Sequence, residues 1–371
     1  MKNTKFEIEN GVLEKYREDF RHITVPEGVT EIAPMAFSHS SFFTLTVPEG
    51  VKKIGAYAFS TCEYLQKVFL PSTLTEIDGS AFEHCLSLER IEVAPENPVF
   101  CSEDGVLYNK EKTKLICWPR SFFKDEETEP PDVFSVPDGV KEIGDYAFFG
   151  CRAPREIKLP DSVEHIGRDA FSVSRLRKIR LSRRLKTLGQ AAFLGCEELE
   201  SVRLPDSLKT LEVRVFAFCK LLKTVKLPKR LISIGYSAFE DCDAMKTIEL
   251  PQRLKTIESS AFAGCYWLNS ICIPDSVIKL ENYVFDGCNH MEWARIGSGV
   301  TTLPEATFGA CYSMKTLTFP AGLKTIDAQA FSGCTALKTV RYGGSEEQRE
   351  ELQINAKGNE TLLKAHWFYE Q

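Results

Sequence analysis

Residues 251–273 read PQRLKTIESSAFAGCYWLNSICI, and this stretch of 23 residues decides the fold because much of the remaining chain repeats it. Counted from Pro251 as position 0, apolar residues stand at positions 3, 6, 17, 20 and 22, Ala-Phe at 10 and 11, and cysteine at 14. The copies begin at Pro26, Pro48, Pro71, Pro137, Pro160, Ser182, Pro205, Pro228, Pro251, Pro274, Gly297 and Pro320. One copy, which we call a coil, cannot bury its own apolar face, so the twelve copies predict a solenoid of stacked coils.

The last part of each coil predicts a β-strand. Residues 247–250 (TIEL) alternate between outward and inward positions, and the proline that follows ends the strand because it has no N–H. Positions 8 to 13 are too short for a long helix and predict one or two turns of α- or 3₁₀-helix. Phenylalanine at position 11 of every coil predicts an aromatic spine in the core. The expected fold class is an α/β solenoid with a parallel sheet on its concave face and short α or 3₁₀ turns on its convex side.

The coils leave three segments to be explained. We expect a capping hairpin at 1–25, coils 1–3 at 26–93, a hairpin and acidic loop at 94–136, coils 4–12 at 137–342 and a C-terminal cap at 343–371, all in one elongated domain. Asn10-Gly11 and Asp104-Gly105 are typical of hairpin turns. The acidic, proline-containing stretch 122–132 predicts an exposed loop. Ser345 with Gln348 fits a capping box, and Asn359 is expected to cap a second helical turn.

Composition bounds the class of partner. The chain has 46 Lys and Arg against 52 Asp and Glu, so its net charge of −6 gives no reason to expect specific nucleic-acid binding. The N-terminus has scattered charges in place of a signal peptide's apolar core, and no window is apolar enough for a membrane span. These features predict a cytoplasmic monomer. A longer gene with an export signal would place it at the cell surface or outside the cell.

Thirteen cysteines suggest disulfides in a small secreted protein, but their spacing here points elsewhere. Ten of them occupy position 14 of their coils: Cys62, Cys85, Cys151, Cys196, Cys219, Cys242, Cys265, Cys288, Cys311 and Cys334. Two coils that are one residue short carry Ser40 and Ser174 instead. Parallel side chains stacked in this way have poor disulfide geometry, so we expect a structural ladder facing the next coil's backbone. Metal binding and redox chemistry are the alternatives, although no CxxC pair or Cys/His cluster supports a metal site.

Catalytic motifs are missing from the sequence. The six histidines fall at unrelated positions of the repeat or in the caps, so stacking does not gather them. No glycine-rich phosphate loop, HExxH or GxSxG is present. We therefore expect no enzyme activity and no cofactor or metal.

Candidate binding residues lie at the outward positions of the predicted sheet. The row at position 21 holds Lys158, Arg180, Arg203 and Lys226 in consecutive coils, with Lys178 nearby, and Trp293 and Arg295 face outward from a later strand. Cations about 4.8 Å apart repel one another unless a partner answers them, and a tryptophan beside an arginine is typical of an interface hot spot. The alternatives are a solvated face with ion pairs, for example to Asp161 and Asp206, and a tryptophan that covers its neighbours.

The repeat resembles the BspA-type leucine-rich repeat family. PDSVEHIGRDAF, PKRLISIGYSAFEDCDAMKTIEL and AGLKTIDAQAFSGCTALKTV follow that family's pattern, and the resemblance covers residues 26–342. It implies a right-handed leucine-rich solenoid and supplies no catalytic residues. The expected function is a non-catalytic scaffold that binds another protein, possibly an acidic one, through its concave face. Since many members are surface proteins, an adhesin for host or matrix components is the alternative, and an enzyme is disfavoured.

Overall fold

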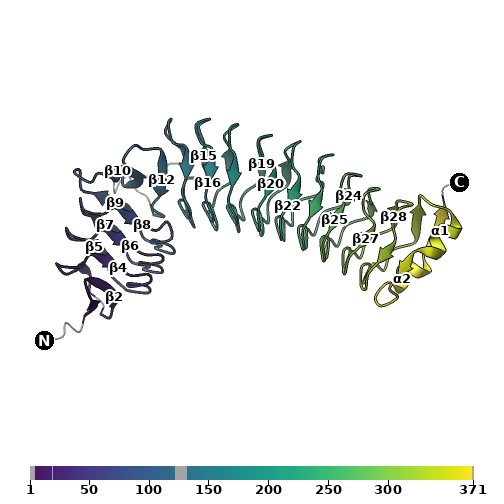
Figure 1. Cartoon of the computed structure of the whole chain (residues 1–371), viewed down its shortest axis with the longest axis horizontal. Coiled ribbons are helices and arrows are strands. Elements are labelled where there is room, and N and C mark those ends of the chain that lie inside the picture. The colour runs from purple at the N-terminus through teal and green to yellow at the C-terminus, as the bar shows by residue number, and fades with distance from the viewer. Residues whose placement is uncertain (1–4, 19, 122–131, 370–371) are drawn as a thin grey trace. The chain divides into compact units, whose positions relative to one another are not determined.

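The computed structural model describes residues 5–18, 20–121 and 132–369. It divides into two compact units, residues 1–176 (unit 1) and 177–371 (unit 2), and each is described by itself. In both units every coil runs through a stack of parallel strands (Figure 1). Most of the expected acidic loop lies outside the described residues.

With the exception of one coil in unit 2, each regular coil contributes a long strand of three or four residues and a short strand of two. The long strands of unit 1 are β3 (His22–Thr24), β5 (Thr44–Thr46), β7 (Lys67–Leu70), β9 (Arg90–Val93), β13 (Val133–Ser135) and β15 (Glu156–Lys158). Its short strands are β4 (Glu31–Ile32), β6 (Lys53–Ile54), β8 (Glu76–Ile77), β14 (Glu142–Ile143) and β16 (His165–Ile166). Long strands therefore pair with long strands and short strands with short strands, and the described strands of each kind fall into two sheets in this unit.

Unit 2 has the same construction. Its long strands are β17 (Lys178–Arg180), β19 (Ser201–Arg203), β21 (Thr224–Lys226), β24 (Ser270–Cys272), β26 (Trp293–Arg295), β28 (Thr316–Phe319) and β30 (Thr339–Tyr342). Its short strands are β18 (Thr187–Leu188), β20 (Thr210–Leu211), β22 (Ser233–Ile234), β23 (Thr256–Ile257), β25 (Lys279–Leu280), β27 (Thr302–Leu303) and β29 (Thr325–Ile326). The register matches equivalent repeat positions, as where Trp293 faces Thr316.

One expected strand is missing from unit 2. Residues 247–250 keep the alternation of the sequence, with Ile248 and Leu250 buried, yet they form no regular strand. The long-strand sheet of this unit is therefore interrupted between β21 and β24. Alternating burial orients the side chains of this segment, but it does not ensure backbone pairing with the neighbouring strand.

The prediction of α- or 3₁₀-helical turns at positions 8 to 13 is wrong. The backbone there forms consecutive tight turns, and residues at positions 9 and 13 have positive φ, as in Tyr57 (58°) and Thr61 (59°). A right-handed helix needs negative φ throughout. N–H groups of this segment instead donate to the next coil, as Phe37 does to the Ala58 carbonyl at 2.8 Å. These bonds between coils alternate with turn bonds within the coil, such as that from the Ser38 N–H to the Met35 carbonyl at 3.0 Å.

The predicted aromatic spine is confirmed. In unit 2, seven rings from Phe193 to Phe331 stack with centroids 5.2 to 5.5 Å apart. In unit 1, Phe59 lies 5.5 Å from Phe37 and 5.4 Å from Phe82. Because all these rings are buried, each adds roughly 2–3 kcal/mol of hydrophobic stabilisation.

Both predicted hairpins are present in unit 1. The first joins β1 (Phe6–Glu9) to β2 (Val12–Tyr16), and the second joins β10 (Phe100–Glu103) to β11 (Val106–Asn109). Asn10-Gly11 and Asp104-Gly105 form their turns with positive φ at both residues. A further strand, β12 (Lys114–Cys117), pairs in parallel with β14, so the insertion continues the stack of short strands.

The C-terminal segment holds the two described helices, α1 (Glu346–Glu351) and α2 (Glu360–Lys364), and the strands β31 (Gln353–Ile354) and β32 (His366–Tyr369) (Figure 1). Ser345 and Gln348 form the predicted capping box. Asn359 precedes α2 but its side chain makes no capping bond. The buried Asn359 amide accepts the N–H of Phe331 at 2.9 Å and donates to the Asp327 carbonyl at 2.8 Å. It thereby stands in for the backbone of a next coil.

Candidate functional site

The candidate site is a groove at the carboxyl ends of three neighbouring long strands of unit 2, β17, β19 and β21. Its volume is about 670 Å³, within the range of ligand-binding clefts. It is lined by Ile179, Arg180, Leu181, Arg183, Arg203, Leu204, Pro205, Asp206, Lys226, Leu227 and Lys229. Five basic side chains and one carboxylate give the groove a formal charge of +4, in contrast to the net negative charge of the chain.

The strands position the charges of this groove. Arg203 and Lys226 are register partners in the parallel sheet, and Arg180 ends the preceding strand. Inward residues such as Val202 are buried, so the flanking side chains of the same strand face outward. Leu204 follows as part of the apolar lining. Three cations therefore stand in a row beside buried leucines.

The three basic side chains of this row form no ion pair with a described residue. Among the described residues no carboxylate lies within 4.0 Å of the charged groups of Arg180, Arg203 or Lys226. Asp206 accepts the backbone N–H of Lys229 at 3.0 Å, so part of its hydrogen-bonding capacity is used within the protein. The positive charges of Arg180, Arg203 and Lys226 are therefore not balanced by direct contact with a described carboxylate.

Two of the five basic lining residues were not predicted from the sequence. Arg183 and Lys229 come one residue after the position that opens their coils, while the predicted row was restricted to position 21. The signal was available, since the turn after each strand brings position 1 next to the end of the strand. A search of positions 21 and 1 together would have identified Arg183 and Lys229 as well.

Other predicted residues lie outside the groove. Lys178 begins β17, two residues before Arg180, and its side chain faces outward without lining the groove. Lys158 belongs to unit 1, where its ammonium lies 3.6 Å from Glu156. For Lys158, the alternative of a solvated side chain in a local ion pair therefore applies.

Trp293 and Arg295 occupy the outward positions of β26, as predicted. Trp293 is 44% exposed, and its register partners are Ser270 and Thr316. Arg295 donates to Asp275 at 3.2 Å. The pKa of Asp275 is lowered, first by the backbone N–H of Ser298 and also by the charge of Arg295. Arg295 is therefore partly balanced, whereas Trp293 presents an open aromatic surface.

The cysteine ladder is buried and chemically quiet. Within the described part of the chain the thirteen cysteines form no disulfide. Eight of the ladder thiols donate to the phenylalanine carbonyl of the preceding coil, as Cys265 does to Phe239 at 3.1 Å. Cys151 donates to the Trp118 carbonyl at 3.7 Å. The expectation that these thiols face the next coil is wrong. Burial raises their pKa, to about 12 for Cys62 and Cys334, which keeps them protonated at neutral pH.

The described residues form neither a cluster of metal ligands nor a membrane-spanning helix. No group of three or more His, Cys, Asp or Glu side chains in the described ranges could hold a metal ion. Of the two described helices, neither has the length and apolar character of a membrane span.

Solved structures similar to this chain are leucine-rich repeat proteins of bacteria. A leucine-rich repeat protein from Eubacterium ventriosum is 28% identical, with a TM-score of 0.50 over 66% of this chain and 76% of the other. A leucine-rich cell surface protein from Faecalibacterium prausnitzii is 21% identical, with a TM-score of 0.54 over 95% and 97%. A leucine-rich repeat protein from Bacteroides ovatus is 22% identical, with a TM-score of 0.50 over 99% of this chain and 97% of the other. The likeness supports the repeat fold.

No curated protein matches the sequence. The family model described as the BspA type leucine-rich repeat region does match, in six copies, at residues 3–109, 121–246 and 233–349. These ranges cover most of the chain and coincide with the stacked coils described above. The chain belongs to the family of BspA-type leucine-rich repeat proteins.

Proposed function

We propose that this protein is a non-catalytic binding scaffold that holds an acidic segment of another protein in the basic groove of unit 2. The carrying observation is the charge of the groove, with five basic side chains and a single carboxylate around one cleft. Arginine clusters bind acidic motifs because each guanidinium offers several N–H donors to carboxylate oxygens.

The lining of the groove combines apolar and basic side chains, which suits a peptide that carries both apolar and acidic groups. Leu181, Leu204 and Leu227 are buried and provide an apolar lining, while the cations at the strand ends stand beside them. The apolar parts of a bound acidic peptide would pack on the leucines as its carboxylates meet the cations. The lining offers no histidine, serine or cysteine for general acid–base or nucleophilic chemistry among its described residues, which favours binding over catalysis.

Trp293 and Arg295 form a second part of the proposal. They lie in the same unit and on a strand of the same kind as the groove, and an exposed tryptophan offers a large rigid contact. We propose that a partner longer than the groove also rests on Trp293. Lys178 would add long-range attraction at the other end of this surface.

A defined acidic probe tests the groove directly. We expect a labelled 20-residue poly-glutamate peptide to bind the native protein, as followed by fluorescence anisotropy, and to bind more weakly as salt is raised. The Arg180→Glu, Arg203→Glu variant should bind at least about tenfold more weakly, because both reversals repel the probe.

The matched control is Lys209→Glu, Lys255→Glu, which makes the same change in net charge at exposed lysines outside the groove. Equal binding by both variants would show that net charge alone attracts the probe, and the groove proposal would be abandoned. A parallel arm with immobilised fibronectin and laminin addresses the adhesin alternative. Retention that depends on Arg180 and Arg203 would identify a matrix partner.

A further inference from the structure

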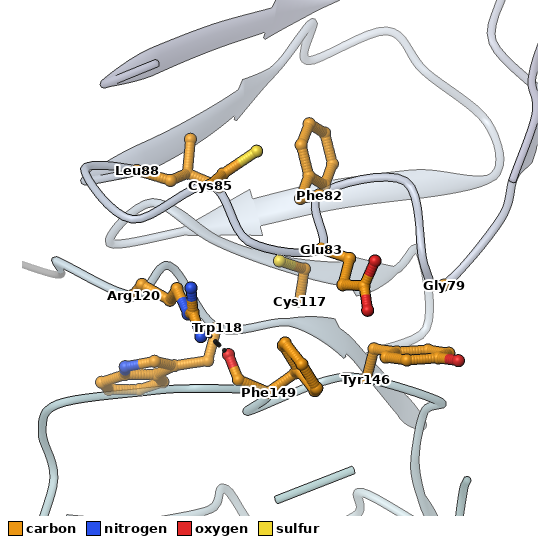
Figure 2. A pocket seen from close by; sticks show the side chains of 10 residues that line it. All are labelled: Gly79, Phe82, Glu83, Cys85, Leu88, Cys117, Trp118, Arg120, Tyr146 and Phe149. Carbon is orange, nitrogen blue, oxygen red and sulfur yellow. Dashed lines mark hydrogen bonds between the residues drawn. The ribbon is translucent and has the colours of Figure 1, made fainter. Parts of the chain in front are cut away.

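A small cavity in unit 1 has a different character from the basic groove. It lies where β12 leads into the next regular coil, and its space of about 10 Å³ suffices for one water-sized particle. Cys85, Leu88, Cys117, Trp118, Arg120 and Phe149 provide much of its lining (Figure 2). Its walls are thiols, apolar side chains and aromatic rings, with the Arg120 guanidinium and the Glu83 carboxylate as the charged groups.

Arg120 is only 7% exposed and is held in place from several sides. Its Nε donates to the Phe149 carbonyl at 3.0 Å, and its guanidinium lies 5.3 Å from the centre of the Phe149 ring. A Cβ atom at Gly150 would fall 1.3 Å from Nη2, so the glycine leaves the space that the guanidinium fills. The Phe149 carbonyl, the Phe149 ring and the space at Gly150 together fix the position of the guanidinium.

Arg120 lines the cavity, and one of its donors has no acceptor. Its Nη1 is buried and has no hydrogen-bond partner among the described residues. Burial lowers the pKa of Arg120, but an arginine keeps its proton throughout the ordinary pH range. A buried cation of this kind is strongly destabilising unless a negative charge lies close to it.

The charge of Glu83 acts on Arg120, but without direct contact. Within the part of the chain that the structure describes, no carboxylate lies within 4.0 Å of the Arg120 guanidinium. Glu83 also lines the cavity, but it accepts a hydrogen bond from Ser60 at 3.2 Å and lies 3.9 Å from His84. Arg152 adds a second positive charge to the surroundings of Arg120.

We propose that the cavity binds one small monovalent anion, chloride, against Nη1 of Arg120. The thiol of Cys117 points toward the guanidinium and supplies a second, weaker donor (Figure 2). The small space excludes phosphate and carboxylates, and the nearby Glu83 disfavours an ion of higher charge. A water molecule would satisfy the hydrogen bond but would leave the charge unbalanced. The site lies outside the basic groove and does not depend on its function.

Bromide replaces chloride in such sites and can be located by its anomalous scattering. We expect crystals of the native protein grown in sodium bromide to show an anomalous peak within hydrogen-bonding distance of Arg120 Nη1. Ordinary density for a water at that point, without an anomalous signal, would overturn the proposal. This measurement needs no variant and therefore does not depend on whether a substitution folds.

Stability in solution gives a second test. At constant ionic strength, the native protein should melt about 2 °C or more higher in sodium chloride than in sodium gluconate, because gluconate is too large for the cavity. Arg120→Met should remove this difference, while Arg152→Met, which removes the exposed neighbouring cation, should keep it. Equal melting of the native protein in both salts, or an unchanged difference in Arg120→Met, would contradict chloride binding at this site.

Discussion

At the scale of single residues, the cysteine at position 14 shows how one side chain links two coils. Cys265 is buried, and its Sγ donates to the Phe239 carbonyl of the preceding coil at 3.1 Å. Cys242, Cys288 and Cys311 repeat the contact at 3.1 to 3.3 Å. The thiol both fills space and satisfies a carbonyl, which explains why serine can replace it in the two shorter coils.

Replacing Cys265 separates these two contributions. Cys265→Ala removes both the volume and the donor, and we expect it to lower the free energy of unfolding by about 1–3 kcal/mol. Cys265→Ser retains a donor and should cost less. Urea unfolding followed by circular dichroism measures both variants, and a larger loss for serine than for alanine would show that the hydrogen bond contributes little.

The buried thiols of the ladder also make the free energy of unfolding depend on pH in the alkaline range. Burial raises the pKa of Cys62 and Cys334 from 9.0 to about 12, so between these values the unfolded chain loses protons that the folded chain keeps. Their contribution to stability is complete below pH 9 and declines as the pH rises toward 12. From pH 8 to pH 10, the ionisation of each thiol in the unfolded chain should lower the free energy of unfolding by about 1.4 kcal/mol.

A Cys62→Ser, Cys334→Ser variant provides the comparison. Urea titrations at pH 8 and pH 10 should show a decline that is smaller than the native decline by about 2–3 kcal/mol. If the two declines are the same, ionisation of these thiols does not govern alkaline unfolding.

At the scale of elements, the turns at positions 8 to 13 depend on residues with positive φ. Gly287 stands at position 13 with φ of 75°, and Ala310 occupies the same position of the next coil with φ of 52°. A Cβ at Gly287 would lie 3.5 Å from its nearest neighbours, so space does not prevent substitution. Any cost must come from the backbone conformation.

These two positions should therefore respond in opposite directions. Gly287→Ala should lower the free energy of unfolding by about 1 kcal/mol, and Ala310→Gly should leave it unchanged or raise it by up to about 1 kcal/mol. A helical turn would reverse both signs, because alanine favours helices and glycine disfavours them. Thermal unfolding of the two variants decides between these possibilities.

The comparison of sequence with structure depends on this distinction between side chains and backbone. The positions of Phe262 and Cys265 in the repeat predicted their burial, because periodicity reports which side chains face the core. Periodicity did not show that Ser260 has a φ of 57°, nor that 247–250 forms no strand, because both depend on bonds to the next coil. At the candidate site, the row at position 21 was visible in the sequence, while Arg183 and Lys229 required the geometry of the turn.

At the scale of the whole molecule, the array needs an end that resembles another coil. β32 pairs with the last long strand, β30, and Asn359 accepts the N–H of Phe331 at 2.9 Å. Without these partners the final coil would present unpaired backbone groups along an exposed edge, which favours association between chains.

Truncation after Gly343 should produce self-association that depends on concentration, as measured by size-exclusion chromatography with light scattering. Within the full chain, Asn359→Ala should lower the free energy of unfolding by about 1–3 kcal/mol, because it leaves buried backbone groups unsatisfied. Asn355→Ala is the control, since the Asn355 side chain accepts only an exposed N–H from Lys357. A monodisperse truncated protein, or equal losses in the two asparagine variants, would show that the cap is dispensable.

The way in which Asn359 closes the array also bears on how such genes change length. Its amide recognises an N–H and a carbonyl that every regular coil offers at the same positions, and it contacts few features peculiar to the last one. Duplication or loss of a whole 23-codon segment upstream would therefore deliver an equivalent surface to the same C-terminal cap. Recombination between repeats can lengthen or shorten the protein while a single asparagine continues to terminate it.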